Sequence, residues 1–380
     1  MLNVHQHWDP LKVCVVGRSY PPDFYSWITV PRVRSLFEKI AIETEEDYQN
    51  IINKLHSFGV ETMRPNLPTL NFFNNRFIAP PMNPRDVTAM IGSTFYTTIN
   101  VDQPFQTFYS SVRDASWPDC NTLDDFKNLP PNIQQECVQI HKLDYNALAT
   151  NEYQPVFDFV KQQGNKIKYT GEYDINGAMV SRIGRDLYFG TRSYNESKES
   201  IAHYQEFIDQ EFNLYRNHIV NTGGHSDGTF CAVCPGLIVS LYDVPTYQHT
   251  FPDWEVVYLP GQSWHMVNDF LSLKQKNRGR WWIPGFEHDH DVINVVEQWL
   301  GHWTGYVEET VFDVNMLVVD PKNVLVFNYN KTVFDALERH GVTPHIVPFR
   351  HRYFWDGGIH CITSDLHREG RQQDYFPQRG

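Results

Sequence analysis

The sequence predicts an α/β fold in which repeated strand–strand–helix–strand units are arranged around an axis. Two recurring patterns support this prediction. A helix-like segment, a glycine and a short strand-like run follow one another at several places, and charged or proline-containing turns lead into short apolar runs. No linker or low-complexity tract divides the 380 residues, so we expect a single domain over residues 1–380.

The helix–glycine–strand pattern is clearest around Gly59. Ile51, Ile52 and Leu55 follow helical spacing before this glycine, and an extended run then leads to Pro65. Glycine is expected directly after a helix because that position commonly needs a positive φ. Two further segments of this form are centred on Gly164 and Gly341.

Four turns followed by apolar runs indicate the hairpins of the units: "PRDVTAMIGSTFYTT", "GRDLYFGTRS", "PGLIVSLYD" and "PKNVLVFNYN". Such units must bury their apolar faces against one another, and a closed ring also removes exposed strand edges. An open mixed sheet is the alternative. Residues 102–151 and 273–303 interrupt the pattern, and we interpret them as insertions over the faces of the ring, since long loops are usually functional.

Composition and charge restrict the classes of partner. Ten Trp and 25 Phe indicate a folded protein, and a net charge of −13 repels nucleic acids and anionic membrane surfaces. The N-terminus lacks the apolar core of a signal peptide, and no window is long and apolar enough to span a membrane. Six cysteines are too sparse for a disulfide framework, so we expect a cytoplasmic protein with reduced thiols.

Two short stretches contain candidate catalytic residues. His225 and Asp227 lie two apart at the start of an expected strand, so their side chains should share one face, where they could exchange protons and bind a cation. A polar turn is the alternative. Cys361, in "WDGGIHCITSD", could be a nucleophile or an inert buried thiol, and His360 is not its evident base because strand neighbours face opposite ways.

Two other clusters could hold a metal but have simpler explanations. "CAVC", at residues 231–234, lies in an apolar run without a second cysteine pair, which favours core thiols. "FEHDHDV", at residues 286–292, is better interpreted as a solvated charge cluster. No metal or cofactor is expected.

Four motifs together resemble those of the amidinotransferases of the guanidino-group-modifying (pentein) superfamily, the family of arginine:glycine amidinotransferase. They are "MNPRDV" (82–87), "RIGRDLYFGTRS" (182–193), "HSDGTFCAVCPGLIVS" (225–240) and "GGIHCITSD" (357–365). The resemblance covers nearly the whole chain. It implies a five-bladed β/α propeller with pseudo-fivefold repeats and an active site at the central axis.

The resemblance also implies the roles of individual residues. Cys361 would be the nucleophile, His225 the general acid/base, and Asp86 and Asp227 the carboxylates that hold a guanidinium. The implied reaction moves an amidino group from L-arginine, or a close guanidino donor, to a primary amine such as glycine. It proceeds by a ping-pong mechanism through amidino-cysteine, without a cofactor. Gly357 and Gly358 would leave room for the substrate beside the sulfur.

Three positions depart from the family pattern. A family carboxylate is replaced by Asn176, which keeps an acceptor oxygen but loses the charge; either Asn176 occupies the site, or Asp174 or Glu172 takes over. The family's carboxylate-binding arginine falls at Val244. Its donor-contacting serines fall at Glu308 and Glu309, which would attract an amine. Arg278 and Arg280, in the second expected insertion, are an alternative source of positive charge.

Two other functions stay open at this point. A hydrolase of the deiminase or dihydrolase type would use the same residues with water as the acceptor, and a non-catalytic guanidino-binding protein would keep only the fold. Small-molecule guanidino donors and amine acceptors are the expected partners. A homodimer is the expected assembly, because relatives in the family are often dimers.

Overall fold

The computed structural model describes residues 1–68, 72–73, 76–99, 117–120, 122–132, 134, 152–170, 173–191, 196–241, 247–259, 283, 285–286, 288–300 and 312–380. Most of the insertion expected at residues 102–151, and a large part of the one at 273–303, lie outside these ranges.

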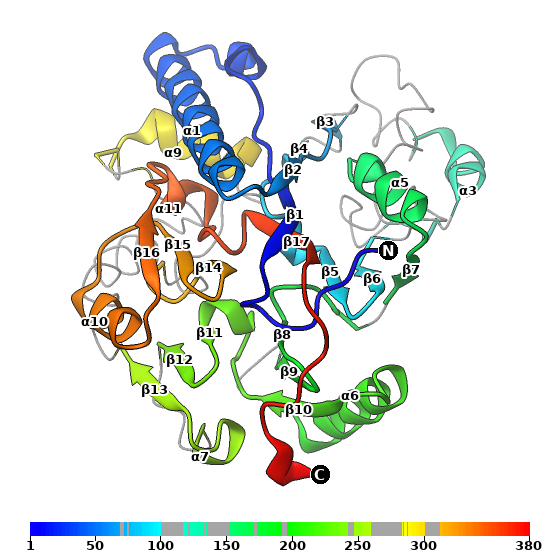
Figure 1. The fold of residues 1–380 in the computed structure, drawn as a ribbon. Helices are drawn as coiled ribbons and strands as arrows, with labels where there is room; N and C mark the ends of the chain where they lie inside the picture. Colours follow the sequence, from blue (N-terminus) through cyan, green and yellow to red (C-terminus); the bar gives the residue numbers. More distant parts are fainter. Residues whose placement is uncertain are drawn as a thin grey trace.

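Five three-stranded sheets of one design make up most of the described strands, and Figure 1 shows them around a common centre. In each sheet the middle strand pairs antiparallel with one neighbour and parallel with the other. The antiparallel neighbours, here called the inner strands, are β5 (Thr88–Ile91), β8 (Val180–Ile183), β11 (Phe230–Cys234), β14 (Leu317–Asp320) and β17 (Thr363–Arg368). The middle strands are β6 (Thr94–Thr97), β9 (Asp186–Gly190), β12 (Leu237–Ser240), β15 (Asn323–Val326) and β1 (Leu11–Val16). Their parallel neighbours are β7 (Lys166–Tyr169), β10 (Arg216–Val220), β13 (Glu255–Tyr258), β16 (Thr343–Ile346) and β2 (Glu61–Met63).

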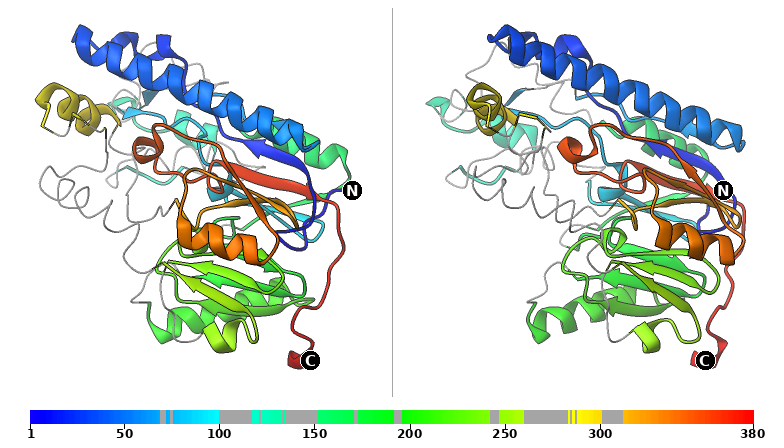
Figure 2. Two further views of the ribbon diagram at one scale, coloured as in Figure 1. Left: turned by 60° about the vertical axis from the view of Figure 1, so that its left-hand side comes forward. Right: turned by 90° about the vertical axis from the view of Figure 1, so that its left-hand side faces the viewer.

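A helix connects the middle strand of each sheet to its parallel neighbour, as a parallel crossover requires. These helices are α1 (Pro31–Ser57), α5 (Gln154–Gln162), α6 (Lys198–Glu211), α7 (Tyr247–Thr250) and α10 (Lys331–Arg339), and they lie on the periphery. The side views in Figure 2 show α1 as a long helix along the outside of the molecule. The predicted glycines after helices are confirmed, since Gly59, Gly164 and Gly341 have φ values of 74°, 77° and 70°.

The remaining described elements are shorter. They are β3 (Phe72–Phe73), β4 (Arg76–Phe77), η1 (Pro22–Trp27), η2 (Pro84–Asp86), α3 (Leu123–Lys127), η4 (Ser226–Gly228), α9 (His290–Val295), η5 (Val296–Leu300), α11 (Arg352–Trp355) and η7 (Pro377–Arg379). None of the described helices combines the length and apolar character that crossing a membrane needs.

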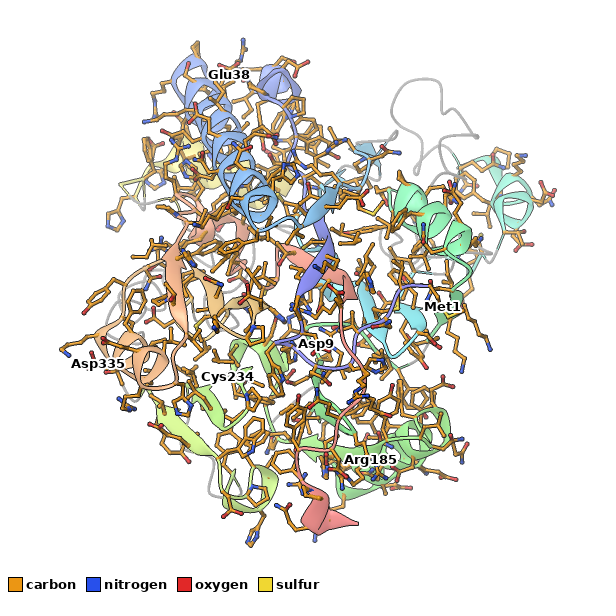
Figure 3. The ribbon with its side chains drawn as sticks, in the orientation of Figure 1. Met1, Asp9, Glu38, Arg185, Cys234 and Asp335 are labelled. Atoms are coloured by element: carbon orange, nitrogen blue, oxygen red, sulfur yellow. The ribbon has the colours of Figure 1, made fainter. Side chains whose placement is uncertain are left out.

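The two ends of the chain meet in one sheet. β17, near the C-terminus, pairs antiparallel with β1, near the N-terminus, with Val16 opposite Thr363. The inner strands also contact one another across sheets, as β17 does with β5 and β11 with β8. Figure 3 shows Asp9 near the centre of this arrangement and Glu38 and Asp335 on its outer helices.

A buried ionic cluster joins three of the sheets at the centre. Asp365 of β17 accepts hydrogen bonds from Arg85 (3.0 Å), Arg182 (2.8 Å) and Arg368 (2.6 Å), and all four side chains are almost completely buried. Burial alone would raise the pKa of Asp365, but the three guanidinium groups outweigh it and hold that pKa well below its usual range. The cluster therefore ties β17 to the chain around β5 and to β8.

Candidate active site

Each inner strand is preceded by a turn that carries a polar side chain. The residues at these positions are Asp86, Asn176, Asp227, Asn315 and Cys361. Hydrogen bonds link several of these turns directly: the Cys361 and Asp227 turns both bond to Asn315, and the Asp227 turn bonds to Ala178 beside Asn176. The repeat thus collects polar groups from different sheets at one place.

Cys361 lies in the middle of these groups. Its Sγ is 3.1 Å from the Asn315 amide nitrogen, which donates to it, and 3.5 Å from Asp227 Oδ2. Burial, and then the nearby carboxylates of Asp227 and Asp86, raise the pKa of the Cys361 thiol well above its usual value. At neutral pH these interactions favour the thiol form of Cys361 over the thiolate.

Asp227 is held by its neighbour His360. The two groups are 2.8 Å apart, and burial, followed by the charge of Arg85, lowers the pKa of His360 to about 4. His360 is consequently neutral at neutral pH and donates its Nδ1 hydrogen to Asp227. Burial alone would raise the pKa of Asp227, but this hydrogen bond together with the nearby basic groups, including Arg85, outweighs burial and lowers that pKa. The other carboxylate oxygen of Asp227 is buried and accepts no hydrogen bond from the described residues.

His225 approaches Asp86, with 3.9 Å between its Nδ1 and Asp86 Oδ1, and both side chains are about 30% exposed. The expectation that His225 and Asp227 share one face of a strand is wrong. They lie in a turn that contains η4, and β11 begins only at Phe230. The turn is fixed because Asp227 N donates to Ala178 O, so Asp227 reaches Cys361 while His225 reaches Asp86.

Asn176 lies in the turn before β8, where it is almost fully buried. Its carboxamide oxygen accepts hydrogen bonds from the backbone N–H groups of Ala178 and Met179, both at 3.0 Å. Two donors occupy the two lone pairs of that oxygen, so it stabilises the turn. Six other positions that the sequence suggests for substrate binding lie outside the described residues: Glu172, Val244, Arg278, Arg280, Glu308 and Glu309.

Asn315 is a site residue that the sequence reasoning missed. Its oxygen accepts from the backbone N–H groups of His360 (2.9 Å) and Cys361 (3.1 Å), and its amide nitrogen donates to Asp227 O (3.1 Å) and to the Cys361 sulfur. One signal could have identified it, because it stands two residues before an inner strand, as Asp86 and Cys361 do.

The glycines before Cys361 do not have the predicted role. A Cβ on Gly358 would lie 2.2 Å from Asn315 Oδ1, and one on Gly357 would lie 2.7 Å from Asn83 Oδ1. Both glycines therefore make room for asparagine side chains, not for a substrate beside the sulfur.

Two cavities adjoin the site. A cavity of about 320 Å³ includes Asp86 in its wall and is bounded by residues 79–83 and Trp355. A smaller one, of about 20 Å³, lies between His7, Ser181, Asp227 and His360, and it is large enough for one water molecule.

The two metal-like clusters have structural explanations. Cys234 is buried and Cys231 packs against the same core cluster, which confirms thiols in or near the core. Burial raises the pKa of Cys231 to about 12 and that of Cys234 to about 11. Asp289 caps α9 and pairs with Arg32. Among the described residues, no group of three or more His, Cys, Asp or Glu side chains could hold a metal ion.

Two solved amidinotransferase structures have a fold similar to that of this chain. An amidinotransferase of the saxitoxin biosynthetic pathway from Microseira wollei superposes with a TM-score of 0.60 at 17% identity, and 99% of each chain is covered. Inosamine-phosphate amidinotransferase from Streptomyces griseus superposes with a TM-score of 0.61 at 16% identity and the same coverage. The fold of this chain is therefore the propeller-like α/β fold of these enzymes.

Proteins of similar sequence are amidinotransferases as well. Glycine amidinotransferase from Xenopus tropicalis is 22% identical over 416 residues, which covers 98% of this chain and 84% of that protein. Inosamine-phosphate amidinotransferase 1 from Streptomyces glaucescens is 22% identical over 410 residues, or 99% of each chain. No family model matches. The predicted resemblance is confirmed: the chain is a homologue of amidinotransferases, which are transferases.

Proposed function

We propose that this chain transfers an amidino group from a guanidino donor to a primary amine through a covalent adduct on Cys361. The observation that supports it best is the set of groups around the sulfur. Asp227 lies 3.5 Å away, Asp86 acts on the thiol electrostatically, and His225 is 3.9 Å from Asp86. This is an anionic site beside a potential nucleophile, which suits a guanidinium.

Substrate binding and activation of the thiol are coupled in this proposal. The guanidinium donates N–H groups to Asp86 and to the unused oxygen of Asp227. Its positive charge offsets the two carboxylates that raise the pKa of Cys361, so the thiolate becomes accessible when the donor binds. The proton leaves to His225.

The reaction then has two halves. The thiolate attacks the guanidinium carbon, the bond from that carbon to the substituted nitrogen breaks, and the departing amine takes a proton from His225. The product of this half is an amidino group on Cys361 Sγ. In the second half an acceptor amine loses a proton to His225 and attacks the same carbon, the C–S bond breaks, and the thiolate is regenerated.

Several further assignments belong to this proposal. Asn176 contributes through the shape of its turn. Glu309, which lies outside the described residues, is assigned to substrate binding from the sequence alone. We also propose a closed five-bladed propeller of one domain, a cytoplasmic location and a homodimer. Sedimentation velocity tests the last of these.

Mass spectrometry tests the proposed function. The protein is incubated with a guanidino donor and no acceptor, and an added amidino group is expected on the peptide that contains Cys361. Cys361→Ser should carry none. Free urea or ammonia in place of amidino transfer, once a primary amine is added, would favour a hydrolase. Absence of any adduct across donors would contradict the proposal.

A further inference from the structure

The larger cavity beside the site contains a second carboxylate that the reaction does not use. Glu152 and Asp86 both line this space of about 320 Å³, which we call the Glu152 pocket. Its other walls include Pro80, Pro81 and Trp355, which suit the methylene chain of a ligand. Asp86 belongs to both the pocket and the Cys361 site, so a substrate held at Cys361 can extend into the pocket.

The charged groups that line the pocket, Glu152 and Asp86, are both carboxylates. Asn83 Oδ1 is buried and receives no hydrogen bond from the described residues. No Lys, Arg or His is present among the described residues that line the pocket. A carboxylate placed here would lose its hydration without gaining a cation, and it would face Glu152 and Asp86.

Glu152 itself is well placed to bind a cation. Its backbone is fixed by the hydrogen bond from Asn66 N to Glu152 O at 2.8 Å, and the next residue, Tyr153, is buried in the core. No described Lys or Arg forms an ion pair with its carboxylate. Burial raises the pKa of Glu152, as expected for a partly desolvated carboxylate.

We infer that the Glu152 pocket binds the ammonium end of the guanidino donor, so that the preferred donor is an amine-terminated alkylguanidine and not an α-amino acid such as arginine. This inference rests on the proposed function. An alkyl chain runs from the guanidinium, held by Asp86 and Asp227, to an ammonium held by Glu152 and Asn83 Oδ1. The first half-reaction then breaks the bond between the amidino carbon and the chain nitrogen, and it releases a diamine whose new amine carries the proton from His225.

Steady-state kinetics with agmatine and arginine as donors, and one fixed amine acceptor, test this inference. We expect the wild-type protein to have the higher kcat/KM for agmatine. Glu152→Gln should lower kcat/KM for agmatine by about tenfold to a hundredfold, since a hydrogen bond to a charged group is lost. The same substitution should leave kcat/KM for arginine unchanged or raise it, because a repulsive charge is removed. Glu152→Asp, which keeps the charge, should keep the preference.

Glu338→Gln, on the exposed face of α10, is the matched control and should change neither donor's kinetics. Preference of the wild type for arginine, or an equal effect of Glu152→Gln on both donors, would overturn the inference. Adduct formation on Cys361 separates the two ideas. If an adduct forms but arginine is the preferred donor, only the assignment of the donor is wrong. If no donor gives an adduct, the proposed function is wrong as well.

Discussion

In the proposed mechanism, the environment of Cys361 keeps the thiol unreactive until a substrate binds. Two carboxylates and burial raise its pKa, so the unliganded site holds a protonated sulfur. In the proposed reaction the same carboxylates bind the guanidinium, whose charge offsets their effect on the thiol. The proposal therefore confines the reactivity of Cys361 to the complex with a cationic substrate.

This argument predicts an unusual pH profile for alkylation. Without substrate, reaction of Cys361 with iodoacetamide should accelerate only at pH values above the ordinary thiol pKa of 9.0, because the pKa is raised and the thiol form persists to higher pH. Asp227→Asn should move the profile to lower pH, since an anion beside the sulfur is lost. Peptide mass spectrometry measures the rate, with Cys361→Ser as the blank. A profile that matches N-acetylcysteine would contradict the argument.

Single residues of the site were predictable to different degrees. Cys361, His225, Asp86 and Asp227 were found because they stand in motifs of an order that resembles a known family. Asn315 was not predicted, because its importance arises from four hydrogen bonds to residues about 45 or 90 positions away in the chain. Asn176 was named from the sequence, but only the structure shows its oxygen bonded to the turn.

At the scale of elements, the site is built by turns at equivalent ends of strands. Helix–glycine–strand segments could be predicted because their periodicity and their glycines are local signals. The conformation of the turns could not be predicted from such local signals. His225 and Asp227 were expected on a strand, yet their turn adopts η4 because Asp227 N and Ser226 Oγ bond to Ala178 O of the neighbouring unit.

The turn before β17 gives a prediction at this scale. Gly358→Ala would place a methyl group 2.2 Å from Asn315 Oδ1, so the asparagine must move and the hydrogen bonds that hold the Cys361 backbone would weaken. We expect kcat to fall about tenfold or more while the protein still folds. Circular dichroism and thermal unfolding report the fold, and the rate of adduct formation reports the site.

Gly164→Ala is a useful comparison, because it lies at a helix end where an added Cβ would contact nothing within 4 Å. Its positive φ should lower stability without a direct effect on the sulfur. Equal activity of Gly358→Ala and the wild type would show that Asn315 does not hold the nucleophile.

At the scale of the whole molecule, the arrangement of the five sheets depends on contacts that join the beginning of the chain to its end. The repeated units were predictable, but the pairing of β17 with β1 links residues more than 340 positions apart and leaves no local signal. The Asp365 cluster also depends on distant contacts, because two of its three buried guanidinium groups, those of Arg85 and Arg182, lie 280 and 183 positions from Asp365. The three positive charges of the cluster destabilise the fold unless Asp365 is ionised and offsets part of them.

Asp365→Asn should therefore lower the free energy of unfolding at neutral pH by about 3–5 kcal/mol, because three buried cations lose their counter-ion. The pKa of Asp365 is depressed in the folded protein, so its contribution is present above the unfolded-state pKa and is lost as the pH falls through the folded-state pKa. Urea unfolding from pH 7 to pH 3 measures this, with Asp335→Asn on exposed α10 as the control. The wild type should lose stability towards acid more steeply than Asp365→Asn. Parallel curves for the two proteins would show that the cluster does not set the acid limit of the fold.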